Sequence, residues 1–141
     1  MISAEYARAL RSAGVAWTPS PGDAFRIDSP EFDGDTFTVS DMTIEPHEFD
    51  TGTILGFNGT TEWALDSVAL EDALWLPRED QLRELLGTAF RSLKRVDGGY
   101  RTDAAINESL AHFYDSDPAG AYAQALLALV ATARLTPTPA E

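Results

Sequence analysis

The stretch REDQLRELLGTAFRSLKRVDGGYRT, residues 78–102, decides the fold, because it joins the chain's strongest helix pattern to its strongest hairpin signal. Apolar residues recur at three- and four-residue steps from Leu82 to Leu93, so we expect an amphipathic helix over residues 78–93. Asp97–Gly98 then lies between two strand-like runs, which is the pattern of a two-residue β-hairpin turn. A helix followed by an antiparallel hairpin indicates an α+β fold.

Three further helices are expected, each marked by a residue type that favours a helix start. Their N-termini are placed at Ser3, at Thr60 or Thr61, and at Asp117. The first ends before Gly14, and the second includes Ser67–Val68. The last has Pro118 at its first helical position, where a missing N–H group costs nothing.

Short strands are expected between these helices. Alternation and β-branched residues predict strands at residues 24–27, 36–44, 53–57, 73–76, 94–96, 100–102 and 109–114, with EPHEFDTG (45–52) as a hairpin loop. We therefore expect one α+β domain over residues 1–135, in which about four amphipathic helices pack an antiparallel sheet of five to seven short strands. Residues 136–141 have the composition of a disordered tail.

The charge of the chain is large and unevenly distributed. The chain of 141 residues has 23 acidic and 10 basic side chains, and a formal net charge of −13. Between Arg26 and Arg78 there are 12 acids and no Lys or Arg, so nearly all of the net charge lies in residues 27–77. This balance argues against nucleic acid or an anionic membrane as the ligand, because both require a basic surface.

Two interpretations of the acidic segment stay open at the level of sequence. It is either a solvated surface that aids solubility or an acidic docking face for a basic or amphipathic partner protein. A site for a hard cation is a third, weaker alternative. The candidate partner-binding residues are Asp33, Asp35, Asp41, Glu45, Glu48 and Asp50.

Motifs for a metal or a cofactor are missing from the sequence. The chain has no cysteine, which excludes thiolate metal ligation and a cysteine nucleophile. The segment from Asp33 departs from a calcium-binding loop, because Thr38 stands where that loop needs glycine and Ile44 where it needs glutamate. No phosphate-binding loop, dinucleotide fingerprint or nucleophile elbow is present. We therefore expect no cofactor, no metal and no catalytic residue.

The two histidines offer little more chemistry. His47 is flanked by Glu45 and Glu48, a setting that suits either a metal ligand or a solvated loop histidine. His112 alternates with Leu110 and Tyr114, so we expect its side chain on one face of a strand rather than against a substrate.

The stretch GFNGTTEWALDSVALEDALWLPREDQLRELLG, Gly56 to Gly87, resembles a family of small acidic actinobacterial proteins, some of them labelled CpaE-type pilus assembly proteins. The similarity extends to VSDM at Val39–Met42, DGGY at Asp97–Tyr100 and the ending AYAQALLALV. It thus covers most of the chain. It implies no particular activity, cofactor or site residue, and the missing glycine–lysine phosphate loop implies no ATP binding.

These observations predict a small soluble interaction or regulatory module without enzymatic activity. The alternative is an enzyme or small-ligand binder with a site near Asn58, Thr60, Thr61 and Glu62. A structural subunit of a homo-oligomer is a third possibility. We expect a cytoplasmic protein, because the N-terminal arginines lie inside an amphipathic pattern and no apolar run of signal-peptide length follows.

Overall fold

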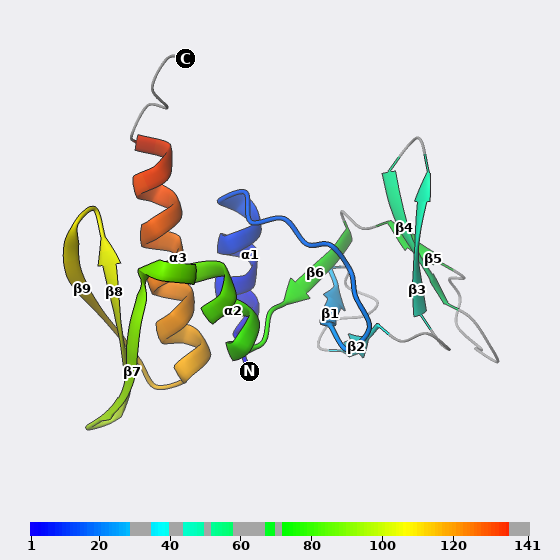
Figure 1. Cartoon of the computed structure of the whole chain (residues 1–141). Helices are drawn as coiled ribbons and strands as arrows, with labels where there is room; N and C mark the ends of the chain where they lie inside the picture. The colour runs from blue at the N-terminus through cyan, green and yellow to red at the C-terminus, as the bar shows by residue number, and fades with distance from the viewer. Residues whose placement is uncertain (29–34, 40–43, 50–51, 58–66, 70–71, 136–141) are drawn as a thin grey trace, which may run out of the picture. The chain divides into compact units, whose positions relative to one another are not determined.

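The computed structural model describes residues 1–28, 35–39, 44–49, 52–57, 67–69 and 72–135, and of the strands between 44 and 69 it describes the backbone (Figure 1). The chain divides into two compact units. Unit 1 comprises Met1–Val15 and Arg78–Glu141, and unit 2 comprises Ala16–Pro77. Each unit is described by itself.

Unit 1 is a helical layer on a three-stranded sheet. Its elements are α1 (Ala4–Ser12), α2 (Glu79–Leu86), the 3-10 turn η3 (Gly87–Ala89), β7 (Phe90–Val96), β8 (Gly99–Ile106), β9 (Ser109–Asp115) and α3 (Pro118–Leu135). The strands form an antiparallel sheet in the order β7-β8-β9. Helix α3 contacts β8, β9, α1 and α2, and it stands between the sheet and α1 (Figure 1).

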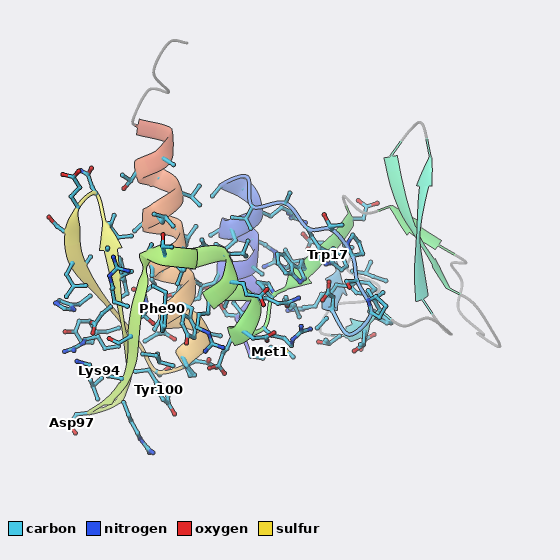
Figure 2. The ribbon with its side chains drawn as sticks, viewed as in Figure 1. Met1, Trp17, Phe90, Lys94, Asp97 and Tyr100 are labelled. Atoms are coloured by element: carbon cyan, nitrogen blue, oxygen red, sulfur yellow. The ribbon has the colours of Figure 1, made fainter. Side chains whose placement is uncertain are left out.

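The core of unit 1 lies where α3 meets the sheet. Tyr122 and Ala125 of α3 are fully buried, and Ala104 and Thr102 of β8 are buried with them. The Tyr122 ring tilts against that of Phe90, with centroids 5.7 Å apart. Phe90, labelled in Figure 2, is the first residue of β7. Burying aromatic side chains of this size is a main source of stability in a unit that has no disulfide.

Two predicted helix starts are confirmed by their caps. The Ser3 hydroxyl accepts a hydrogen bond from the Tyr6 backbone N–H at 3.2 Å and begins α1. The Asp117 carboxylate accepts from the Ala119 N–H at 2.8 Å and begins α3. Both caps satisfy N–H groups that have no partner within the helix.

The predicted helix over residues 78–93 is too long. Helix α2 ends at Leu86, because Gly87 adopts φ +57°, a conformation that terminates a helix. Phe90 and Leu93 belong to β7, where they pair with Ala104 and Thr102 of β8 across a bulge. The extra bulge residue puts two residues three apart on one face of the strand, and this spacing imitates a helix.

Unit 2 contains two small antiparallel sheets. The first has the order β2-β1-β6, from β1 (Ala24–Ile27), β2 (Thr36–Thr38) and β6 (Ala73–Leu76). The second has the order β3-β4-β5, from β3 (Ile44–Phe49), β4 (Gly52–Phe57) and β5 (Ser67–Ala69). Buried Phe25, Ile27, Val39 and Ala73 form the core of the first sheet, with Trp17 and Phe37 packed against it.

The α+β class is confirmed, whereas the element counts and the single sheet are wrong. The described residues contain three α-helices and nine strands, arranged as three three-stranded sheets. Ser67–Val68 belongs to β5 and not to a helix, and the start of that predicted helix lies outside the described residues. The prediction of one domain over residues 1–135 stays a prediction, and the predicted tail also lies outside the described residues.

The predicted loop EPHEFDTG is also wrong. Its first five residues belong to β3. This strand pairs antiparallel with β4, so that Ile44 lies opposite Phe57 and Phe49 lies opposite Gly52. The predicted strand over residues 36–44 is represented by β2, which ends at Thr38, and by Ile44 at the start of β3. Pro46 is accommodated in β3 because β3 is an edge strand of its sheet, where a proline without an N–H is tolerated.

No helix in the described part of the chain is long and apolar enough to cross a membrane.

Candidate functional site

The predicted site residues fall mostly outside the described residues. Asp33, Asp41 and Asp50 of the acidic set lie there, as do all four members of the second candidate site, Asn58, Thr60, Thr61 and Glu62. Asp35 is exposed just before β2, and Glu45 and Glu48 occupy positions in β3 opposite Gly56 and Thr53. Both sites therefore stay predictions.

The described side chains include a different group of interacting polar and charged residues, on sheet β7-β8-β9. We name it the Asp103 cluster, and it consists of Ser92, Lys94, Arg101, Asp103 and His112. The strand register brings these residues together, since Asp103 lies opposite both Ser92 and His112, and Arg101 lies opposite Lys94. The alternation of β8 places the cluster on the face opposite to buried Thr102 and Ala104.

The carboxylate of Asp103 is the centre of the cluster. It accepts from the Ser92 hydroxyl at 2.6 Å and lies 2.6 Å from Nδ1 of His112. Arg101 contacts both carboxylate oxygens, at 2.8 Å from Nε and 3.2 Å from Nη2. The amino group of Lys94 lies 3.9 Å away. These four neighbours surround the carboxylate, and the Asp103 side chain is only 5% exposed.

These contacts fix the charge state of Asp103. Burial alone would raise the pKa of the carboxyl, but hydrogen bonds from Ser92, His112 and Arg101 together hold the pKa of Asp103 far below its usual range. Arg101 responds in the opposite direction, since its hydrogen bond to Asp103 raises the pKa of the guanidinium. Asp103 is therefore ionised at neutral pH, and the Nδ1–H group of His112 donates a hydrogen bond to it.

The geometry excludes one reaction class for this cluster. The Ser92 hydroxyl donates to Asp103 itself and not to the imidazole, so it is not activated as the nucleophile of a catalytic triad. The His112 side chain is 43% exposed and is oriented by the carboxylate. Within the residues whose side chains are described, no group of three or more His, Asp and Glu side chains is suited to hold a metal ion. The cluster thus ties three strands together through one buried charge.

Sequence reasoning missed this cluster because its members are far apart in the chain. The Asp97–Gly98 turn was predicted, and it could have placed Arg101 opposite Lys94. Placing Ser92 opposite Asp103 depends on the same turn. The pairing with His112 depends on the second turn, at Asn107–Glu108, which has no glycine to mark it.

Unit 2 has a buried carboxylate of its own. Asp23 is 3% exposed and accepts from the Trp17 indole N–H at 2.9 Å and from the Ser20 backbone N–H at 3.1 Å. The Trp17 ring stacks on Trp75, with centroids 6.3 Å apart. Asp23 therefore fixes the loop before β1 and holds an aromatic ring against the sheet.

The net charge differs between the two units in the same way as it differs between residues 27–77 and the rest of the sequence. Unit 2 contains 13 acids and one basic residue, Arg26, so its net charge is −12. Unit 1 contains 10 acids and nine basic residues, so its net charge is −1. One arginine cannot neutralise thirteen carboxylates, whereas unit 1 has nearly one cation for every acid. The acidic segment is thus the main part of a compact unit.

A search of protein-family models, curated proteins and solved structures finds no match to this chain.

Proposed function

We propose that this protein is a small non-enzymatic interaction or regulatory module, in which unit 2 binds a basic or amphipathic protein. The observation that carries the proposal is the net charge of −12 within unit 2, against −1 in unit 1. We still expect the protein to be cytoplasmic and to bind neither nucleic acid nor a membrane.

The negative charge of unit 2 would both attract a basic partner and disfavour acidic ones. A concentrated negative charge attracts a basic partner over roughly the screening length, about 8 Å at physiological salt, and raises the association rate. Like charge across an interface disfavours acidic partners and nucleic acids. A surface that served only solubility would not require the charge to be confined to one compact unit.

The test is capture of partner proteins by the full chain, at low and at high salt. A variant with the six candidate residues neutralised (D33N, D35N, D41N, E45Q, E48Q and D50N) should lose the partners that high salt releases. A control variant carries the same charge change on six acids of unit 1 that lie outside β9 and its turn (E5Q, E79Q, D80N, E84Q, D97N and E141Q). It should retain these partners.

Two results would contradict the proposal. One is the absence of any salt-sensitive partner, and the other is equal loss of binding in both variants. Circular dichroism of both variants checks that each is folded.

A further inference from the structure

The sheet of unit 1 has two edges, and they differ in their protection. Strand β8 is central, and β7 and β9 are the edge strands. In the part of the chain that the structure describes, β9 pairs with β8 alone. An edge strand presents backbone N–H and C=O groups to any extended segment that approaches it.

The turn between β8 and β9 determines which backbone groups face this edge. Asn107 and Glu108 both have positive φ, 52° and 67°, and form a two-residue turn of the type I′ kind. The flanking residues Ile106 and Ser109 are then a hydrogen-bonded pair, and hydrogen-bonded pairs alternate along the ladder. The backbone groups of Leu110, His112 and Tyr114 consequently point away from β8.

A side-chain contact agrees with this assignment. The side-chain amide of Gln124 on α3 donates to the Tyr114 carbonyl at 2.6 Å, where a neighbouring strand would donate a backbone N–H. The chain thus occupies one outward-facing acceptor of β9 with its own side chain.

The edge formed by β7 carries a bulge and exposed basic side chains, which are usual obstacles to pairing. Strand β9 has neither, and Gln124 covers one of its outward-facing acceptors. Strand β7 has a bulge between Phe90 and Ser92 and exposes Arg91, Lys94 and Arg95. Strand β9 pairs with β8 without interruption over seven residues. Leu110 and Tyr114 are the large side chains exposed along it, at 57% each.

We propose that β9 is a docking strand that binds an extended segment of the basic partner by strand addition. The segment has basic residues alternating with large apolar ones, and its apolar residues lie beside Leu110 and Tyr114. This inference rests on the proposed function, because the partner is the same basic protein.

Charge favours this occupant over a second copy of the chain. Glu108 lies just before β9 and Asp115 is its last residue, so an acid stands at each end of the strand and favours a basic segment beside it. Antiparallel pairing of β9 with a second copy would bring Glu108 of one chain near Asp115 of the other, and like charges on neighbouring strands disfavour that pairing.

The experiment uses the full chain labelled with ¹⁵N and the nine-residue peptide KVKFKVKFK as the probe. The control peptide has the same sequence with alternate backbone amides methylated, so it keeps the charge and loses the donors for strand pairing. Binding of the first peptide should shift the amide signals of Leu110, His112 and Tyr114 most. The methylated peptide should bind about tenfold more weakly, the effect of one or two net hydrogen bonds.

Two variants of the chain localise the effect. Leu110→Pro removes an N–H that points away from β8, and such a proline is tolerated in an edge strand. It should lose the β9 shifts. Leu110→Ala keeps the N–H and loses only an apolar contact, so it should weaken peptide binding less than Leu110→Pro does. Amide spectra of both variants without peptide check that unit 1 is folded.

The outcomes separate this inference from the proposed function. Equal binding of both peptides, with shifts in unit 2 only, overturns strand addition and leaves the acidic binding surface intact. Failure of both peptides to bind overturns both proposals. Shifts along β9 that depend on protein concentration without peptide assign the edge to a second copy of the chain and overturn the inference.

Discussion

The two units use their carboxylates differently. In unit 1, several acids have partners within the unit: Asp103 is held by Arg101 and His112, Asp117 caps α3, and Asp80 pairs with Arg78. Unit 2 has Arg26 as its one base for 13 acids, so most of its negative charge cannot be neutralised by cations of the same unit. Unit 1 therefore uses several of its acids in contacts that support its fold. The acids of unit 2, similar in number, give that unit a strong negative electrostatic potential.

The units also differ in what fills their cores. Unit 1 packs an 18-residue helix against two further helices and a sheet. Unit 2 packs aromatic rings against a three-stranded sheet, with Phe25 between Trp17 and Phe37 at centroid distances of 5.5 and 5.6 Å. Unit 1 thus draws its stability from helix–sheet packing, and unit 2 draws it from a small aromatic cluster.

The largest expected effect is on the core of unit 1. Tyr122→Ala removes a buried ring that packs on Phe90, and it should lower the free energy of unfolding by about 3 kcal/mol. Denaturant titration measures this loss, and hydrogen exchange shows whether the β8 amides lose protection. Leu85→Ala, at a residue 40% exposed on α2, is the control and should cost less than about 1 kcal/mol. Equal losses would show that Tyr122 is not central to this core.

A smaller effect is expected on the aromatic cluster of unit 2. Asp23→Ala leaves the Trp17 indole N–H and the Ser20 N–H without their acceptor, which should cost about 2 kcal/mol. Tryptophan fluorescence should change with it, because the Trp17 ring is no longer held. Asp35→Ala, at an exposed position in the same unit, should leave both readings unchanged. A change as large in Asp35→Ala would contradict a specific role for Asp23.

The third effect depends on pH and sharpens the contrast between the two kinds of carboxylate. Asp103→Asn should lower the free energy of unfolding by about 1.5 kcal/mol at pH 7, because it removes a hydrogen-bonded charge. The pKa of Asp103 is lower in the folded state than in the unfolded state. Its contribution is therefore complete above the ordinary carboxyl pKa of about 4 and declines as the pH falls toward the folded-state value.

Denaturant titrations of the wild type and of Asp103→Asn at pH 7 and pH 3 measure this dependence. The difference between the two proteins should be smaller at pH 3. Asp97→Asn, at an exposed turn, should show no such difference at either pH. A gap for Asp103→Asn that stays constant between the two pH values would contradict the assigned charge state.

The sequence predicts those parts of the fold that local chemistry determines. Ser3 and Asp117 mark helix starts, and Asp97–Gly98 marks a hairpin, because each residue type suits its backbone position without help from the rest of the chain. The β7 bulge gives Phe90 and Leu93 a helix-like spacing. The turn at Asn107–Glu108 lacks the glycine that would mark it in the sequence. The Asp103 cluster requires both hairpins in register, so no local pattern contains it.

The measurement that tests the central claim most directly is the salt dependence of binding of a lysine nonapeptide to three proteins. These are the wild-type chain, the variant with six unit 2 acids neutralised, and the matched unit 1 variant. If unit 2 holds the binding surface, affinity should fall steadily with salt for the wild type and the unit 1 variant, and the slope should be much shallower for the unit 2 variant. The same slope in both variants would contradict the account, since binding would then depend on total charge alone.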